Sequence, residues 1–215
     1  MDNALERELD EQRIKSLLTR ERYYRDTAQW QNLRDSYHPD ASKTAIKITW
    51  FGLRSIFDST LYEGDADGFV SGSQEMAQRG ASSSHTICPV VIHFDEKHEK
   101  ALSESTGSIN SRFCIDGHDY DCTSYARFIS RLEKVDGEWK MLTLEAIYDR
   151  DTITTSLPML STPAKFDMKG HRDSYRCIGW LLAGKGFEIN RDLPGTDRPE
   201  SVTSLMGEAF TWLKY

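Results

Sequence analysis

Two titratable side chains, His85 and Asp26, have types suited to acid–base chemistry. An imidazole titrates near neutral pH, so it can take a proton from a substrate and return it without a cofactor. A carboxylate beside the ring would orient it and stabilise its charged form, as in a Ser-His-Asp triad. Each residue also has a structural interpretation, because Asp26 can cap a helix and His85 can bond to a helix end or strand edge. Together the two predict a base and the group that orients it.

Three further polar residues could assist such a base. Tyr24 continues the apolar stripe of a predicted helix, so its phenol could polarise a substrate oxygen, although core packing is the favoured interpretation. The segment 102–112 carries polar side chains at its even positions, including Asn110 and Arg112. If that face lined a pocket, these residues would hold an anionic or carbonyl oxygen, whereas a solvated face is the ordinary interpretation. The catalytic candidates are therefore His85, Asp26, Tyr24 and Arg112, with Asn110 as a substrate contact.

Aromatic side chains in the predicted strands are candidates for binding a substrate. Trp50 and Phe51 lie in an early strand, and Tyr125, Phe128 and Tyr148 lie in later ones. A pocket shaped for an aromatic or terpenoid molecule would need these residues, but so would the core of a curved sheet. Composition does not separate the two interpretations.

Several motifs for cofactors and nucleophiles are missing from the sequence. There is no P-loop, no G-x-G-x-x-G after a predicted strand, no H-E-x-x-H and no G-x-S-x-G. The four cysteines have no C-x-x-C spacing and no paired histidines nearby, so they predict reduced thiols rather than a zinc site or disulfides. We therefore expect chemistry without a metal, a nucleotide or another cofactor.

The elements that must position these residues come in two groups. Helical spacing of apolar residues predicts three helices, over residues 5–25, 28–37 and 69–79. Alternation and β-branching predict one short strand and four long ones, over residues 46–51, 86–94, 100–113, 120–133 and 138–148. Long consecutive strands joined by turn signals such as Asp136-Gly137 predict an α+β fold, in which a twisted antiparallel sheet curls over the helices.

Residues 151–215 lack the regular helix and strand patterns of residues 1–150. Prolines and glycines interrupt them often, yet side chains such as Trp180, Leu181 and Phe187 are too apolar for a free tail. We therefore predict a domain over residues 1–150 and an irregular C-terminal extension that packs on this domain or on a partner subunit. Packing on a partner would make the protein a homo-oligomer, most simply a symmetric dimer or else a trimer.

Charge and composition limit the partners and the location. The 215 residues are 38% hydrophobic and 28% charged, which is enough apolar material for a packed core. The net charge of −7 and the lack of a basic block exclude nucleic acid as a partner. The sequence has no apolar run of the roughly 18 residues that cross a bilayer, and its charged N-terminus has no signal core. We expect a cytoplasmic protein with a small-molecule substrate and no membrane partner.

The order of these elements, with several local strings, resembles the SnoaL-like branch of the nuclear transport factor two-like superfamily over residues 10–150. The strings are YRDTAQWQNL at 24–33, YHPDA at 37–41 and LEKVDGEWKM at 132–141, together with His85 after the third helix. The resemblance implies a cone-shaped barrel, in which a curved antiparallel sheet wraps on three N-terminal helices and encloses one deep pocket.

Within this superfamily, scytalone dehydratase and related lyases are the most similar in motif. They carry an aspartate four residues before a tryptophan, which matches Asp26 and Trp30, and a histidine that opens the strand after the third helix, which matches His85. The resemblance implies that Asp26 and His85 form a catalytic pair in the pocket. It also implies a cofactor-independent lyase, of dehydratase or retro-aldol type, for a small aromatic or polycyclic molecule.

Two positions depart from the pattern of these lyases. Ser111 or Arg112 falls where they have a second histidine, and Arg25 replaces a tyrosine before the aspartate. Members of the superfamily differ in reaction, so an isomerase or cyclase stays open, as does a non-catalytic module for small-molecule binding or dimerisation. A purely apolar pocket would favour the module, and a buried Asp–His bond in a polar and aromatic pocket would favour the enzyme.

Overall fold

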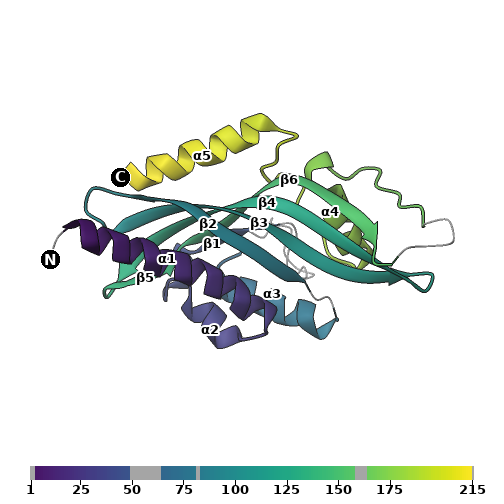
Figure 1. The fold of residues 1–215 in the computed structure, drawn as a ribbon, viewed down its shortest axis with the longest axis horizontal. Helices are drawn as coiled ribbons and strands as arrows, with labels where there is room; N and C mark the ends of the chain where they lie inside the picture. Colours follow the sequence, from purple (N-terminus) through teal and green to yellow (C-terminus); the bar gives the residue numbers. More distant parts are fainter. Residues whose placement is uncertain (1–2, 49–63, 81–82, 158–163, 215) are drawn as a thin grey trace.

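The computed structural model describes residues 3–48, 64–80, 83–157 and 164–214. These residues form three N-terminal helices, a six-stranded sheet and two C-terminal helices (Figure 1). Within these ranges no helix is long and apolar enough to cross a bilayer.

The three N-terminal helices lie together on one face of the sheet (Figure 1). They are α1 (Asn3–Asp26), α2 (Trp30–Asp35) and α3 (Ala66–Gln78). In α1 the side chains of Ile14, Leu17 and Leu18 are buried, and their spacing forms the apolar stripe that faces the sheet. The carboxylate of Asp65 caps α3 by accepting a hydrogen bond from the Gly68 amide at 2.8 Å.

The sheet has the strand order β1-β6-β4-β3-β2, with β5 paired to β4. All neighbouring strands are antiparallel except β1 and β6, which are parallel. The strands are β1 (Ala45–Lys47), β2 (Ser84–Phe94), β3 (Lys100–Ile115), β4 (His118–Val135), β5 (Glu138–Met141) and β6 (Thr143–Thr155).

Two tight turns set the register of the long strands. Asp116 and Gly117 join β3 to β4, and Asp136 and Gly137 join β4 to β5; all four have positive φ angles, between 51° and 83°. Positive φ at both central positions is the type I′ geometry, which matches the right-handed twist of paired strands. The Asp-Gly pairs in the sequence therefore predict these two hairpins correctly.

The sheet is curved but does not close (Figure 1). The register shifts between Pro89 and Val91 in β2, and between Tyr148 and Arg150 in β6, opposite Tyr125 and Ala126 of β4. Such irregularities bend a strand and increase its twist. The predicted α+β fold with a curved antiparallel sheet over three helices is confirmed, as an open cone rather than a closed barrel.

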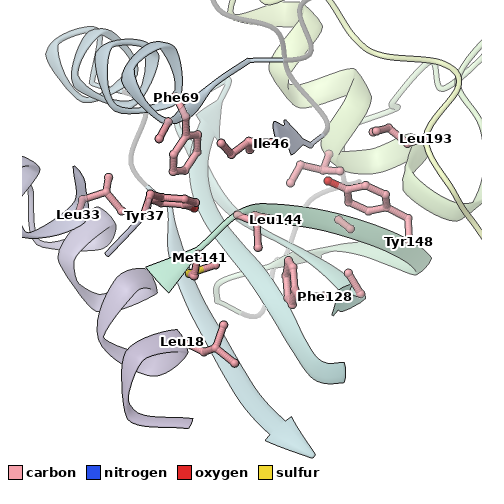
Figure 2. Close-up of a cluster of buried hydrophobic side chains, with 14 of the residues drawn as sticks. Leu18, Leu33, Tyr37, Ile46, Phe69, Phe128, Met141, Leu144, Tyr148 and Leu193 are labelled. Atoms are coloured by element: carbon pink, nitrogen blue, oxygen red, sulfur yellow. The ribbon is translucent and has the colours of Figure 1, made fainter. Parts of the chain in front are cut away.

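The main core lies between the helices and the concave face of the sheet. Figure 2 shows Leu18, Leu33 and Phe69 from the helical side facing Phe128 and Met141 from the strands. All five side chains are at most 4% exposed. This packing fixes the end of α1 relative to the strands.

The C-terminal extension is more regular than the sequence predicts. It forms α4 (Arg176–Gly184) and α5 (Pro199–Lys214), and α5 covers the convex face of the sheet (Figure 1). Leu205, Ala209 and Leu213 recur every four residues and pack in a second core with side chains of three strands, Leu102, Ile129 and Ile147. The prolines and glycines that suggest an irregular chain lie mostly between the two helices or at their ends.

Candidate active site

Asp26 and His85 are joined by two hydrogen bonds. The His85 ring Nδ1 lies 2.7 Å from Asp26 Oδ1, and the His85 backbone amide donates to Asp26 Oδ2 at 2.6 Å. An ionised carboxylate only accepts hydrogen bonds, so Nδ1 carries the hydrogen of the neutral ring. The other ring nitrogen, Nε2, then has a free lone pair and can accept a proton.

The chain at the end of α1 leaves the Asp26 carboxylate available for this contact. Asp26 is the last residue of α1, and Ala28 turns the chain with a φ of 58°. The N-cap of α2 is Gln29, which makes no side-chain cap. Asp26 is therefore not a helix cap, because both of its carboxylate oxygens are bonded to His85 at the start of β2.

His85 lines a pocket between the helices and the concave face of the sheet. Apolar and aromatic walls come from Phe69 of α3, Ile109 of β3 and Phe128 of β4, and Tyr148 of β6 adds a further ring. The pocket leaves about 50 Å³ in which the centre of a water molecule can lie, several times the roughly 15 Å³ that one water needs.

Electrostatics keep His85 neutral and Asp26 ionised at neutral pH. Burial lowers the pKa of His85 to about 4; the charges of Arg22 and Arg25 act in the same direction, and the bond to Asp26 opposes them. Burial would raise the pKa of Asp26, but the hydrogen bonds from His85 and the charge of Arg25 hold it below its usual value. A neutral imidazole beside an ionised carboxylate is the form of the pair that can act as a base.

Two arginines of α1 also line the pocket. Arg22 is 4% exposed, pairs with Glu21 through two nitrogens, and has its guanidinium 5.5 Å from the Phe69 ring centroid. Arg25 is 9% exposed; its Nη1 donates to the Ser83 hydroxyl at 2.6 Å and lies 3.4 Å from Asp26 Oδ1. Positive charge thus lies beside the base, where it can stabilise developing negative charge.

Two of the aromatic residues predicted to bind a substrate are at this site. Phe128 and Tyr148 line the pocket, and both are almost completely buried. Trp50 and Phe51 lie outside the described residues.

The structure places Tyr24 and Arg112 away from this pocket, which corrects their predicted catalytic roles. Tyr24 packs at the edge of the core and lines a separate groove between α1, α2 and β5, because it lies about 200° around the helix from Arg22. The Arg112 side chain is 64% exposed and pairs with Asp121 at 2.8 Å on the convex face. Successive strand residues point to opposite faces, so Ser111 lines the pocket and Arg112 does not.

Asn110 and Tyr125 also lie outside the pocket lining. Asn110 Nδ2 donates to the Ser108 hydroxyl at 3.1 Å on the same strand face as Arg112. Tyr125 is 38% exposed, and its ring stacks with the guanidinium of Arg150 at 4.6 Å. The even positions of β3 therefore carry the outward face of the strand, which is the ordinary interpretation of their polarity.

Several pocket residues are missing from the sequence-based prediction. Arg22 has a signal in the sequence, since it lies four residues before Asp26 on a predicted helix and so shares its face, whereas helical spacing gives no such signal for Arg25. The contribution of α4 has no comparable signal, because residues of the extension reach the pocket only through tertiary packing. They are Ile178, Leu181, Leu182 and Lys185.

Comparison with known sequences identifies relatives along most of the chain. A PEP2-like protein of the fungus Fusarium vanettenii is 25% identical over 204 residues, which cover 89% of this chain and 80% of that protein. Pea pathogenicity protein 2 of the same fungus is 24% identical over 189 residues, which cover 85% of this chain and 73% of that protein.

Solved structures share the fold at low sequence identity. A hexachlorocyclohexane dehydrochlorinase from Novosphingobium barchaimii has a TM-score of 0.54 at 15% identity, covering 75% of this chain and 100% of that chain. A candidate scytalone dehydratase from Novosphingobium aromaticivorans has a TM-score of 0.51 at 16% identity, covering 72% of this chain and 96% of that chain. A Mycobacterium tuberculosis protein of unknown function has a TM-score of 0.55 at 16% identity, covering 88% of this chain and 97% of that chain.

A protein-family model matches more than half of the chain. The model of the SnoaL-like domain matches residues 6–145, which include most of α1, Asp26, His85 and most of the sheet. The open cone of the structure agrees with the fold of the solved relatives. The chain therefore belongs to the family of SnoaL-like domains.

Proposed function

We propose that this protein is a cofactor-independent lyase that acts on a small aromatic or polycyclic molecule through His85 and Asp26. The observation that carries the proposal is the largely buried Asp26–His85 pair, which leaves one nitrogen of the ring for a ligand in a pocket with aromatic walls. A base and its orienting carboxylate are the groups that a cofactor-free elimination requires.

The reaction follows from the two states of the His85 ring. Nε2 removes a proton from a substrate carbon, and the electron pair of that C–H bond becomes a new C=C bond. A hydroxyl group on the neighbouring carbon departs with its bonding pair and takes the proton from the imidazolium, so that water leaves and His85 returns to its neutral state. Asp26 stabilises the imidazolium between these steps.

The remaining polar groups of the pocket support this sequence. Negative charge develops on the substrate when the proton is removed, and the buried guanidinium groups of Arg22 and Arg25 lie in the same pocket. Preorganised charges in a site with little water stabilise such a transition state strongly. Ser111, one of the two residues at about the position of the second histidine of related lyases, adds a hydroxyl to the pocket lining.

Two alternatives share part of this chemistry. A retro-aldol cleavage or a double-bond isomerisation begins with the same base, so it is a variant of the proposal. A non-catalytic binding module would need no buried base, and the polar and charged lining of the pocket argues against it. Two structural relatives are named as a dehydrochlorinase and a candidate dehydratase, and both names denote eliminations.

The test uses the aldol of benzaldehyde and acetone, together with acetophenone in deuterium oxide. Loss of water from the aldol gives a conjugated ketone, whereas cleavage gives benzaldehyde, so chromatography separates the two reactions. Deuterium exchange into acetophenone, measured by mass spectrometry, reports proton removal alone. We expect at least one of these reactions to run about 10³-fold faster than with His85→Ala. Rates equal to those of His85→Ala for both compounds would overturn the proposal.

A further inference from the structure

The pocket that holds His85 is lined by cations from two parts of the chain. Arg22 and Arg25 belong to α1, and Lys185 follows α4 in the C-terminal extension, beyond the residues that match the family model. Among the described residues that line the pocket there is no carboxylate. The protein as a whole carries a net charge of −7, so the pocket and the molecule have opposite signs. A concave site of one sign concentrates ligands of the other sign.

Lys185 differs from the two arginines in its partners. Arg22 is paired with Glu21, and Arg25 lies beside Asp26, so each guanidinium group has a protein carboxylate as a partner. The Lys185 ammonium forms no ion pair with any residue in the described part of the chain. The side chain is also partly buried, and this burial lowers the pKa of Lys185. Lys185 is thus the cation of the pocket that a ligand can neutralise.

The backbone at both ends of α4 fixes the position of Lys185. At the first turn, Asp151 Oδ2 of β6 accepts a hydrogen bond from the Ile178 amide at 2.9 Å. At the other end, the Lys185 amide donates to the Leu182 carbonyl at 3.0 Å, and Gly186, with a φ of 84°, closes the helix with a bond to Ala183 at 2.9 Å. Lys185 therefore follows a helix that is anchored to the sheet.

We propose that Lys185 determines the specificity of this pocket by selecting a small apolar ligand that carries a carboxylate or a similar anionic group. The inference rests on the proposed function, because it assigns the substrate class of the same site. The ammonium would form a charge-assisted hydrogen bond with the anionic group. The apolar body of the ligand would pack against the aromatic walls, next to His85.

Two matched pairs of probes test this inference by binding rather than by turnover. They are benzoate with benzamide and 2-naphthoate with 2-naphthamide, measured on the full chain by ligand-observed NMR titration. The members of each pair have nearly the same shape and differ in charge. We expect at least one carboxylate to bind about tenfold more tightly than its amide.

Substitutions of Lys185 test whether the preference for a carboxylate over its amide depends on this residue. Lys185→Met should abolish the preference for the carboxylate, and Lys185→Arg should retain it because the positive charge is kept. Lys169→Met is the matched control: it removes the same charge from an exposed lysine of the extension and should leave the preference unchanged. Circular dichroism of each variant verifies that the protein is folded.

Equal binding of each carboxylate and its amide, or no binding of either carboxylate, would overturn the inference. A preference that survives in Lys185→Met would overturn it as well. The same titration on His85→Ala separates this inference from the proposed function. If the preference persists there while the wild-type protein shows no His85-dependent reaction, the lyase proposal fails and the assignment of Lys185 stands.

Discussion

Two buried histidines in this protein are bonded to carboxylates with nearly the same geometry. His85 Nδ1 lies 2.7 Å from Asp26, and His38 Nε2 lies 2.8 Å from Glu133; each histidine side chain is 7% exposed. Distance and burial therefore do not distinguish the two pairs. They differ in what the second ring nitrogen does and in the surroundings of the ring.

The second nitrogen of His38 is already used by the protein. His38 Nδ1 accepts a hydrogen bond from the Asp40 amide at 2.9 Å, and Lys43 shares Glu133 at 3.0 Å. His38 is thus a structural link between a loop and β4. His85 uses only Nδ1 for Asp26, and its ring lines the pocket. A histidine–carboxylate bond therefore indicates catalysis only where the other nitrogen faces a space that a ligand can enter.

Replacing both histidines by asparagine tests this distinction, and His85→Asn should have the largest effect. The side-chain amide of the introduced asparagine can still donate to Asp26, so the structural bond is retained while the base is removed. We expect turnover of a substrate found by the assay above to fall by about 10³-fold, within the range for general acid–base catalysis. A loss of activity that merely follows the loss of folded protein would show that His85 is structural.

Asp26→Asn should have the next largest effect. An asparagine can present its amide to the ring and favour the tautomer with a hydrogen on Nε2, and that tautomer is not a base on the pocket side. We expect turnover to fall by about 10²-fold, less than in His85→Asn, because the imidazole is still present. Turnover equal to that of the wild-type protein would show that Asp26 does not orient the base.

The pH dependence of stability should report the buried imidazole. The pKa of His85 is lowered from 6.5 to about 4 in the folded protein. Below about pH 6.5 the unfolded chain binds a proton that the folded protein does not, so this histidine destabilises the fold as the pH falls toward 4. The cost is about 2 kcal/mol at pH 5 relative to pH 8.

Urea unfolding of the wild-type protein and of His85→Asn at pH 8 and pH 5 measures this cost. The difference in unfolding free energy between the two proteins should change by about 2 kcal/mol between these pH values, in favour of the variant at pH 5. A difference that is the same at both pH values would contradict the lowered pKa.

His38→Asn should have the smallest effect on function. The bond to Glu133 is lost, while the asparagine oxygen can still accept from the Asp40 amide. We expect the unfolding free energy to decrease by about 1 kcal/mol, with turnover per folded molecule unchanged. A fall in turnover comparable to that of His85→Asn would remove the distinction between the two pairs.

The sequence predicts the parts of this site that depend on local rules. The Asp-Gly turns and the helix ending at Asp26 follow from neighbouring residues, and the pairing of Asp26 with His85 follows from the family resemblance. The prediction of site residues fails where it depends on which face of a strand lines the pocket. Alternation in β3 separates Ser111 from Arg112, but the direction in which the sheet curves decides which of them faces the pocket.

The contribution of the extension could not be predicted for a related reason. Lys185 reaches the pocket because Asp151 anchors α4 to β6 and because the sheet curves toward that helix. Both conditions depend on contacts between segments that are distant in sequence, and no periodicity in residues 151–215 encodes them. Sequence patterns show that this segment is apolar enough to pack, but not where it packs.

Nitrogen NMR of the histidine rings tests the central claim most directly, because it needs no substrate. A long-range ¹⁵N–¹H correlation spectrum of the labelled protein, recorded across a pH titration, identifies the tautomer and the midpoint of each ring, and His85→Asn assigns the signal. We expect His85 to carry its hydrogen on Nδ1 at neutral pH, with Nε2 unprotonated, and to titrate with a pKa of about 4. A hydrogen on Nε2, or a midpoint near the ordinary value of about 6.5, would contradict a neutral base held by Asp26.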